Sequence, residues 1–273
     1  MGGARPREEP IDRPRVGLVC NQDHDVFSGV ADRLERVGIA VEVYEPGRWL
    51  GADDLADLSL LMNKKVDLAS FDALSLAERI GLPTWNGYST LLLGIRPIGY
   101  WALDRVGFRV PAVSFQKPNS NYVAKRLVDF HSQPNPVLNG EGEIFHEYVP
   151  ATPIDYKYYG VDTGSGIEVR VLKTTSKLHG EKAPLELVDP DPGLAENLRK
   201  LVGMMGSQAI GVDCVEADGE SWAVDVNPAP SFRHTGMVDA LTRSVLARLP
   251  VAVTAHESIE TVGLQPQGDF YPR

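Results

Sequence analysis

Three polar residues toward the C-terminal end of the chain have the types and spacing of a metal site. Asp213 lies in the apolar run 209–215. After a turn that contains Asp-Gly, a second run, 221–226, includes Asp225 and is followed directly by Asn227. Asp-Gly is a strong hairpin signal, and side chains two residues apart on a strand share a face. The three oxygen-bearing side chains should therefore converge across a hairpin. Carboxylate and amide oxygens suit one or two Mg²⁺ ions that bridge nucleotide phosphates.

Taken singly, each of these residues is explained as well by a polar strand end near solvent. The three together, flanked by apolar strand residues, favour a ligand site, because buried carboxylates need a cation or a basic partner. The sequence shows no Cys/His metal spacing, no Gly-x-Ser-x-Gly elbow and no Walker loop. Oxygen-ligand metal chemistry is therefore the chemistry that the residues favour.

A local reversal of charge occurs at residues 170–182, in a chain whose formal net charge is −10. Its charged residues are one acid, Glu181, and four bases, Arg170, Lys173, Lys177 and Lys182. Basic groups of this kind grip phosphates, and Lys125, which follows the apolar residues 122–124, has the same character. The alternative is a solvated strand and loop without a ligand, because a lysine that closes a strand is often only an edge charge.

Two further segments are weaker candidates. Residues 139–143, Asn-Gly-Glu-Gly-Glu, have the glycines for a loop over a phosphate, although a plain β-turn explains them as well. Glu147, Tyr148 and Val149 form a predicted strand that ends at Pro150. Backbone groups at such a place can pair with an adenine edge, but the residues alone do not select that role.

The elements that must position these residues begin with a parallel part. Residues 15–21 and 39–44 are apolar or β-branched runs, with an amphipathic helix predicted at 26–37 between them. This β-α-β pattern predicts a parallel sheet, since parallel neighbours need a crossover. A strand, a helix and a short strand are predicted next, at 58–63, 70–80 and 82–85. A small α/β domain is therefore expected at residues 15–90.

Beyond residue 90 the pattern changes. A helical stretch, 89–107, is broken or kinked by a proline, and strand-like runs follow with little helix between the first two. These runs are residues 122–125, 143–149, 155–161 and 168–173. Helices are predicted at 192–208 and 238–249. The prediction is an α/β (α+β) chain, with a linker and central lid subdomain at 91–150 and a C-terminal subdomain at 151–262.

Composition favours a soluble enzyme that acts on small molecules. Residues 1–14 lack the apolar core of a signal peptide and are expected to be a disordered lead-in, and residues 263–273 a loose tail. No apolar run reaches the roughly 18 residues of a membrane span. The net charge of −10 argues against nucleic acid as a partner. Cys20 and Cys214 lie in apolar runs, as reduced, buried thiols of a cytoplasmic protein do.

In their order, these features resemble the ATP-grasp superfamily, over roughly residues 80–240. The likeness is strongest at 211–236, where Gly-Val-Asp and then Val-Asp-Val-Asn-Pro look like the paired metal strands of that family. It implies that Asp213, Asp225 and Asn227 hold Mg²⁺. It also implies that ATP meets Lys125, Glu147, Tyr148, Val149, Lys157 and Arg170. The implied catalytic, phosphate-facing bases are Arg170 and Lys173.

Three departures from the family pattern bear on catalysis. Only 21 residues separate Lys125 from Glu147, where the family fits a glycine-rich loop and a helix, so the expected lid is short or is supplied by another segment. The earlier lysine of the family has no evident counterpart, and Arg96 is the candidate substitute. The residues after Pro228 are Ala-Pro-Ser-Phe, where Ser-Pro-Gly is frequent.

The resemblance implies an ATP- and Mg-dependent carboxylate–amine ligase, similar to the ribosomal-protein glutamate ligases, that forms an acyl phosphate on a small molecule or peptide. One alternative is a small-molecule kinase, because residues 156–160 and the Asp-x-Asn strand also look like the inositol tetrakisphosphate kinase branch. Another is a catalytically weakened nucleotide-binding protein, which the short lid favours. Arg233 and His234 are the substrate candidates, with a surface arginine as the equal alternative for Arg233. A homo-oligomer is left open.

Overall fold

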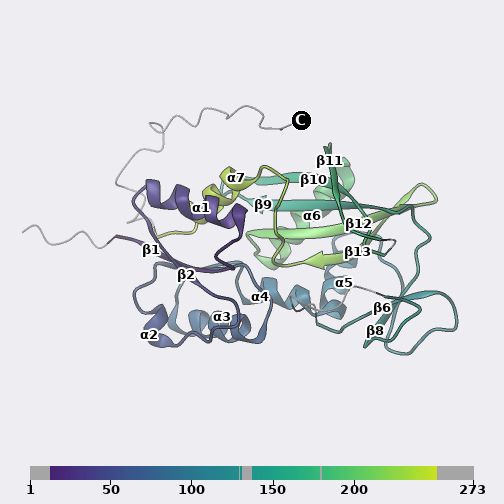
Figure 1. Cartoon of the computed structure of the whole chain (residues 1–273), viewed down its shortest axis with the longest axis horizontal. Coiled ribbons are helices and arrows are strands. Elements are labelled where there is room, and N and C mark those ends of the chain that lie inside the picture. The colour runs from purple at the N-terminus through teal and green to yellow at the C-terminus, as the bar shows by residue number, and fades with distance from the viewer. Residues whose placement is uncertain (1–12, 129, 131–136, 179, 251–273) are drawn as a thin grey trace, which may run out of the picture.

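The computed structural model describes residues 13–128, 130, 137–178 and 180–250. Within these ranges the chain forms a parallel sheet at one end of the molecule, a large antiparallel sheet in the middle and a small antiparallel sheet at the other end (Figure 1). This mixed architecture confirms the predicted fold class. The predicted lead-in and tail lie outside the described residues, apart from residues 13 and 14. Among the described residues, no helix has both the length and the apolar character that a membrane crossing requires.

The N-terminal sheet is parallel and has the strand order β2-β1-β3-β4. Its central strand is buried on both faces: Val16 and Leu18 pack toward α1, while Val19 packs in the core that includes α3. The two helices therefore cover opposite faces of the sheet (Figure 1). The elements are β1 (Arg15–Val19), α1 (Asp25–Arg36), β2 (Ala40–Tyr44), α2 (Ala52–Leu55), β3 (Leu60–Asn63), α3 (Leu68–Ile80) and β4 (Thr84–Trp85).

Helical connections lead from this sheet to the small one. The helical stretch predicted at 89–107 is divided into α4 (Tyr88–Leu91), the short 3₁₀ turn η1 (Leu92–Gly94) and α5 (Arg96–Arg105). The predicted proline break falls just before Pro97, which sits in the first turn of α5, where a missing N–H costs no helical hydrogen bond. The small sheet has the order β5-β8-β6-β7, from β5 (Val113–Ser114), β6 (Tyr122–Lys125), β7 (Val137–Leu138) and β8 (Ile144–Glu147).

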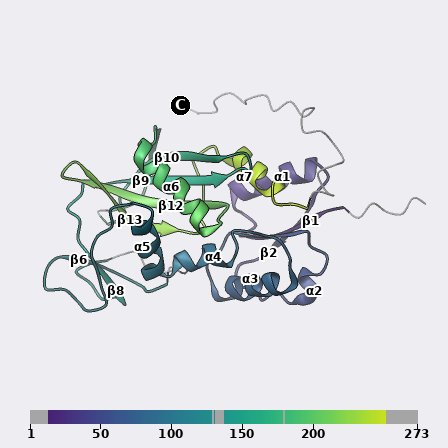
Figure 2. The same ribbon diagram turned by 180° about the vertical axis from the view of Figure 1, so that it is seen from behind.

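The large sheet is antiparallel, with the order β11-β10-β9-β12-β13. One face carries Tyr158 and Val212 and packs against α5 and α6, and the other carries Tyr159 and Leu172 and packs toward α1 and α7. Figure 2, in which the molecule is seen from behind, shows α6 lying across the large sheet. The elements are β9 (Ile154–Asp162), β10 (Ile167–Thr175), β11 (Pro184–Val188), α6 (Pro192–Met205), β12 (Ala209–Ala217), β13 (Glu220–Asn227) and α7 (Val238–Leu246).

The predicted hairpin between β12 and β13 is present. Asp218 and Gly219 at its tip have φ angles of 53° and 77°. Positive φ at both central residues is what the tight hairpin turns require, and Asp-Gly supplies it at low steric cost. The turn sets the register from the Ala217–Glu220 pair to the Cys214–Ala223 pair, and a shift of one residue then brings Asp213 opposite Asp225.

The end of the chain closes onto its beginning. Helix α7 packs beside α1, where Arg33 Nε donates to Asp239 Oδ1 at 2.7 Å. Trp85 at the end of β4 donates from Nε1 to Ser244 Oγ at 2.9 Å, and both side chains are buried. One core therefore unites the N-terminal sheet with one face of the large sheet, so that the residues after β13 rest against the N-terminal unit.

Candidate active site

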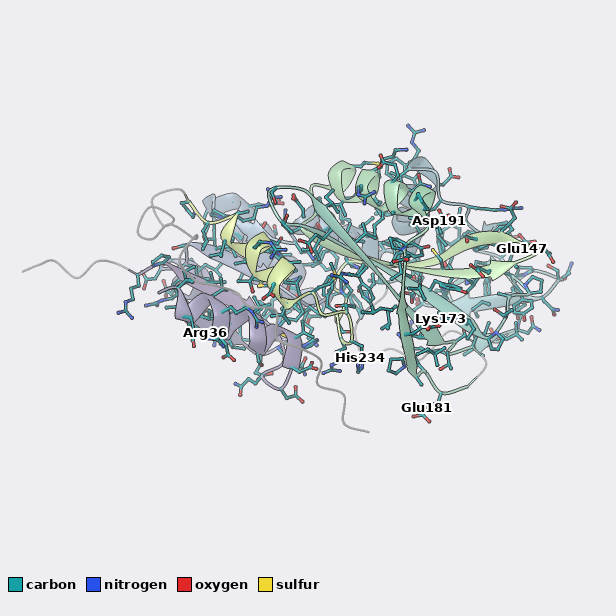
Figure 3. The ribbon with its side chains drawn as sticks, turned by 90° about the horizontal axis from the view of Figure 1, so that it is seen from above. Arg36, Glu147, Lys173, Glu181, Asp191 and His234 are labelled. Atoms are coloured by element: carbon teal, nitrogen blue, oxygen red, sulfur yellow. The ribbon has the colours of Figure 1, made fainter. Side chains whose placement is uncertain are left out.

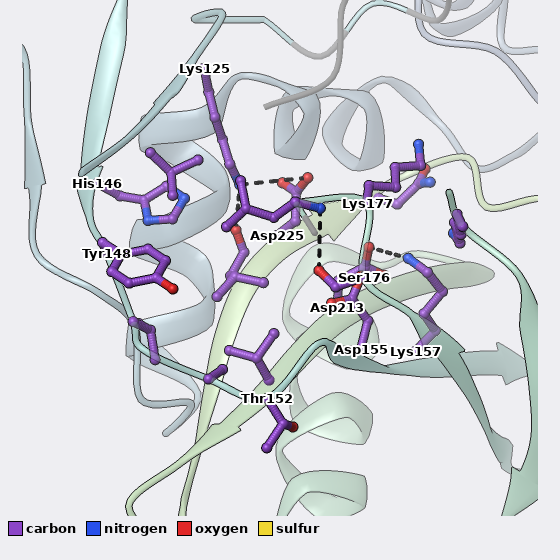
Figure 4. Close-up of a pocket in the computed structure, with 18 of the residues that line it drawn as sticks. Lys125, His146, Tyr148, Thr152, Asp155, Lys157, Ser176, Lys177, Asp213 and Asp225 are labelled. Carbon is purple, nitrogen blue, oxygen red and sulfur yellow. Dashed lines mark hydrogen bonds and ion pairs between the residues drawn. The ribbon is translucent and has the colours of Figure 1, made fainter. Parts of the chain in front are cut away.

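A pocket lies between the large sheet and the small sheet (Figure 4). Strands β6 and β8 form one wall, where Val123 stands opposite His146 in the register. Alternation along these strands puts Lys125 and Tyr148 on the same face. Their neighbours Tyr122, Ala124 and Phe145 form a separate cluster on the other face. Strands β9, β12 and β13 supply the opposite wall.

The predicted metal ligands meet in this pocket. Asp213 on β12 is paired in register with Asp225 on β13, and Gly211 with Asn227. All three oxygen-bearing side chains line the pocket. Lys157 on β9 lies opposite Asp213 on its other side, so the three strands carry a row of one base and two acids. The inferred convergence is present, but it depends on a register shift between Asp213 and Cys214, without which Asp213 would pair with Val224.

A β-bulge brings two adjacent residues of β13 to the pocket. The register shifts after Asp213, so that Cys214 pairs with Ala223 and Val224 is the extra residue. Val224 and Asp225 consequently both line the pocket, although they are adjacent in sequence. The carbonyl of Val224 accepts hydrogen bonds from Tyr100 Oη at 2.8 Å and Lys125 Nζ at 2.6 Å.

Two of the pocket carboxylates, those of Asp225 and Asp213, form ion pairs with basic side chains. Arg96 Nη1 lies 2.6 Å from Asp225 Oδ1, and Lys125 Nζ lies 3.8 Å from Asp225 Oδ2. Burial alone would raise the pKa of Asp225, but the nearby Lys125 and Arg96 outweigh it and hold the pKa below its ordinary value. Asp213 forms an ion pair with Lys157. Burial works against the charge on Lys157, yet the Asp213 carboxylate raises its pKa above the usual range.

Cations outnumber carboxylates at this end of the pocket. Among the described lining residues, three are acids, Asp155, Asp213 and Asp225, and five are bases, Arg96, Lys125, Lys157, Lys177 and Lys182. Loss of solvent around its ammonium and repulsion from Lys157 lower the pKa of Lys182 to about 8. A surplus of positive charge inside a chain of net charge −10 makes this a place where a polyanion is attracted.

The other end of the pocket is apolar. Val149 and Val215 are buried in one cluster, against which Ala151 and Val224 pack. Val123 closes the facing wall, and Tyr148 lies beside it. A slot of this composition suits a flat, aromatic group, such as a nucleobase, held between apolar side chains.

His146 lies at the junction of the two ends. Its Nδ1 is 2.9 Å from the carbonyl of Glu147, which can only accept, so Nδ1 carries the proton. Nε2 is buried and has no partner among the described residues. Burial, with help from nearby Lys125, lowers the pKa of His146 to about 3, so the ring is neutral at ordinary pH.

The predicted hinge is only partly in the pocket. Tyr148 and Val149 line it, whereas the Glu147 side chain is exposed and its amide donates to the carbonyl of Ala112 at 2.8 Å. In the described part of the segment between β6 and β8 there is a two-residue strand, β7, and no helix. This agrees with the short lid expected from the spacing of Lys125 and Glu147.

Two of the predicted phosphate-facing bases do not reach the pocket. Lys173 alternates with Leu172 and lies on the opposite face of the sheet, where its Nζ is 3.4 Å from Glu186. Arg170 is exposed and does not line the pocket. Of the four bases at residues 170–182, the structure brings only Lys177 and Lys182 to the pocket, because the chain turns at the end of β10. Figure 3 marks Lys173 on the large sheet, apart from Glu147.

The predicted substrate residues follow the metal strand on an exposed loop. Arg233 Nε lies 2.9 Å from Asp25 Oδ1, at the start of α1, and both side chains are at least half exposed. His234 is exposed, with a φ of 63°, and Figure 3 marks it near α1 and α7. Neither residue lines the pocket.

Several pocket residues carry no local sequence signal. Arg96 enters from the first turn of α5, and its candidacy came from a missing lysine and not from its own surroundings. Tyr100 supports both Val224 and Lys125 from the next turn of that helix. His146 alternates with apolar residues in a buried strand, a pattern that would equally suit a structural histidine. The packing of α5 against β13 reveals Arg96 and Tyr100, and the pairing of β8 with β6 reveals His146.

The sequence matches no protein-family model and no curated relative. The fold, in contrast, matches solved structures over nearly their whole length. A RimK-domain ATP-grasp protein from Sphaerobacter thermophilus aligns with a TM-score of 0.63 at 15% identity, over 85% of this chain and 99% of that one. The macrocyclase MdnC from Microcystis aeruginosa, bound to the precursor peptide MdnA, aligns with a TM-score of 0.61 at 12% identity, over 85% and 99%.

A third match is the RiPP-associated ATP-grasp ligase from Chryseobacterium gregarium, solved with ADP and with a leader and core peptide. It aligns with a TM-score of 0.61 at 12% identity, over 87% of this chain and 96% of that one. At such identities the likeness establishes architecture and leaves residue roles to the geometry. The chain has the ATP-grasp fold, as its motifs suggested.

Proposed function

We propose that this protein is an ATP- and Mg-dependent carboxylate–amine ligase that activates the carboxylate of a small molecule or peptide as an acyl phosphate. The observation that carries the proposal is that the pocket has two different ends. The end lined by Val149 is apolar, and the end around Asp213 and Asp225 is rich in cations. Solved structures of the same fold support it, since they include ligases in complex with Mg and ADP, or with precursor peptides.

The proposed nucleotide lies along the pocket with its base in the apolar slot. Val149 and Val215 would contact one side of the base and Val123 the other, and backbone groups of the 147–149 segment would meet its edge. The phosphates would then extend toward Lys125 and Lys157, on the two facing walls. A polyphosphate in this place neutralises the surplus of basic side chains, which explains why the pocket tolerates so many of them.

The residues present fit a magnesium ion. Asp213, Asp225 and Asn227 offer hard oxygen donors on one sheet face and in one pocket. No group of three or more His, Cys, Asp or Glu side chains is arranged for a metal in the part of the chain that the structure describes. Since Asp213, Asp225 and Asn227 supply only part of a coordination shell, the site suits an ion that takes its remaining ligands from phosphate and water. When bound, such an ion offsets the negative charge of the transferring phosphoryl group.

In the proposed first step an oxygen of the substrate carboxylate attacks the γ-phosphorus of ATP. The bond from that phosphorus to the β–γ bridging oxygen breaks, and ADP leaves with the electron pair. In the second step an amine nitrogen attacks the acyl carbon, the bond from that carbon to the phosphate oxygen breaks, and inorganic phosphate leaves while the amine loses a proton. Lys125, Lys157 and Arg96 would stabilise the phosphates, so catalysis rests on position and electrostatics.

The loop after β13 is the proposed substrate contact. Arg233 and His234 follow Asn227 closely in sequence, and the Arg233 guanidinium already pairs with the carboxylate of Asp25. A substrate carboxylate would compete with Asp25 for that group. Peptides are candidate substrates, because solved structures of this fold are complexes with precursor peptides.

Turnover with Mg-ATP and carboxylate-plus-amine substrate pairs tests the proposal, with ADP, free phosphate and phosphorylated product followed together. A ligase releases ADP and phosphate in equal amounts. A kinase releases ADP while the phosphate stays on the acceptor, and that outcome would replace the proposed reaction. Failure of Mg-ATP to raise the melting temperature would remove nucleotide chemistry altogether.

Asp225→Asn should abolish turnover while circular dichroism shows an unchanged fold. Asp104→Asn is the matched control, since Asp104 is an exposed acid on α5 outside the pocket, and it should keep full activity. Equal turnover of the Asp225 variant and the wild type would exclude this carboxylate from the mechanism.

A further inference from the structure

The three proposed metal ligands are all engaged inside the protein itself. Asp213 forms an ion pair with Lys157, and Asp225 with Arg96 and Lys125. Asn227 Oδ1 accepts a hydrogen bond from the amide of Ala229 at 2.9 Å. A divalent cation that approached without a nucleotide would therefore have to displace a partner at each ligand.

Arg96 is the most firmly built of these partners. It is the first residue of α5, and its amide donates to the carbonyl of Leu127 at 2.9 Å. Its Nε donates to the carbonyl of Arg126 at 2.8 Å, which leaves Nη1 directed at Asp225. The Arg96 side chain is 8% exposed, and that of Asp225 is 25% exposed. The guanidinium is thus held between the segment that follows β6 and the end of β13.

The charge of the pocket acts in the same direction as this contact. Its described lining residues include five bases and three acids, so a free divalent cation meets net repulsion. A nucleotide polyphosphate reverses the sign of the local field. It also offers acceptors for the very guanidinium and ammonium groups that occupy the carboxylates.

We propose that Arg96 is an exchangeable counter-ion that keeps Asp225 from binding a divalent cation until nucleotide phosphate takes over the guanidinium. Binding is then ordered, with the metal entering only together with the nucleotide. The inference rests on the proposed function, because that function supplies the nucleotide. The contact between Arg96 and Asp225 is independent of it. In this scheme Arg96 acts on the metal through Asp225 and on the nucleotide by direct contact with its phosphate.

The test is a pair of binding measurements on the full chain. Mn²⁺ binding without nucleotide is followed by electron paramagnetic resonance, and binding of a non-hydrolysable ATP analogue without divalent metal by calorimetry. Arg96→Met should bind Mn²⁺ at least about tenfold more tightly than the wild type and the analogue about tenfold more weakly, the size expected for one charged hydrogen bond. Arg105→Met removes an exposed arginine at the other end of α5 and should match the wild type in both.

Opposite changes in the two affinities are the signature that a merely structural role would not give. Arg96→Lys keeps the charge, and it should exclude Mn²⁺ as the wild type does. If Arg96→Met does not fold, the wild type alone decides, because tight Mn²⁺ binding without nucleotide overturns the inference. A wild type that binds neither the analogue nor Mn²⁺ refutes the proposed function, whereas one that binds the analogue while Arg96→Met still excludes Mn²⁺ refutes only the counter-ion role.

Discussion

Lys157 on β9 and Asp213 on β12 stand directly opposite each other in the large sheet and form an ion pair inside the pocket. The Lys157 side chain is 9% exposed and that of Asp213 is 27% exposed. Because Asp213 is also in register with Asp225, this pair fixes the first carboxylate of a row that runs across three strands. The ammonium thereby orients the group that the proposed metal would need.

Lys157→Met should destabilise the protein by about 2 kcal/mol, because it leaves the Asp213 carboxylate without the partner that offsets its burial. Urea unfolding of the nucleotide-free protein measures this loss. Asp213→Asn should cost a similar amount, since it leaves the Lys157 ammonium without a countercharge.

The double variant Lys157→Met/Asp213→Asn separates the pair from its surroundings. If the two side chains stabilise each other, the double variant should lose clearly less than the sum of the single losses. Strict additivity would show that the contact contributes nothing to stability. Lys173→Met, which removes a base from the other face of the sheet, should change the free energy of unfolding by less than about 0.5 kcal/mol.

The hairpin of β12 and β13 could be predicted because it is local. An Asp-Gly turn sets the register of a hairpin, and period-2 alternation then decides which side chains share a face. Alternation puts Asp225 and Asn227 on one face, and the crossover rule covers the N-terminal parallel sheet. Asp213 shares that face only because the register shifts by one residue between Asp213 and Cys214, which neither rule foresees. The same alternation, applied along β10, would have placed Lys173 on the face opposite Leu172, but only once the buried face of that strand is known.

The partners of these residues could not be predicted, because they come from distant parts of the chain. Arg96 and Asp225 are 129 residues apart, and Asn86 meets Ala209 across 123 residues. A helix start and a turn carry no sign of what they will pack against. The bulge at Val224 is similar, since no residue type in that strand demands it, yet it brings two neighbours into one pocket.

Lys64, at the carboxyl end of β3, is predicted to make stability depend on pH. Its Nζ donates to the carbonyl of Ala229 at 2.5 Å, and the residue is 3% exposed. Burial lowers the pKa of Lys64 to about 7, with Lys65 and Arg233 acting in the same direction. Above pH 7 the unfolded chain, with a lysine pKa of about 10.4, holds a proton that the folded chain has released. The free energy of unfolding therefore rises with pH in this window.

Between pH 7 and pH 9 the wild type should gain about 2 kcal/mol of stability relative to Lys64→Met. Denaturant titrations at several pH values give the two curves, and the comparison cancels all other titrating groups. Lys65→Met, at the less buried neighbouring position, should follow the wild-type slope. Parallel curves for the wild type and Lys64→Met would contradict the prediction.

Asn86 links the residue after β4 to β12 and to the residue that follows β13 by hydrogen bonds. It is fully buried, has a φ of 55°, and its Nδ2 donates to the carbonyls of Ala209 at 2.8 Å and Pro228 at 3.0 Å. Its Oδ1 accepts from the amides of Gln208 and Ala209. Asn86→Ala leaves these buried groups unpaired in a left-handed conformation, and should cost about 4 kcal/mol in chemical denaturation.

Two further variants separate the causes of that loss. Asn86→Gly accepts the left-handed backbone and should recover about 1 kcal/mol relative to Asn86→Ala. Asn139→Ala changes an exposed asparagine with a φ of 53°, whose Oδ1 accepts from one amide, that of Tyr122, and should cost only about 1 kcal/mol. Equal losses at positions 86 and 139 would show that the hydrogen bonds of Asn86 do not matter.

His146 is predicted to lower the stability of the empty protein while contributing to the pocket. Its Nε2 is a buried acceptor without a partner among the described residues, and such a group costs about 1–3 kcal/mol. His146→Phe keeps a ring of similar size and removes both the unpaired Nε2 acceptor and the hydrogen bond from Nδ1 to the Glu147 carbonyl. Because the penalty of the buried acceptor is the larger of the two, the nucleotide-free protein should be more stable by up to about 1 kcal/mol. A nucleotide that donates to Nε2 would lose that bond, and its affinity should fall about tenfold. Thermal unfolding without nucleotide, together with calorimetric titration of the ATP analogue, measures both effects, and a variant that loses stability and affinity together would mean that the ring acts only by packing.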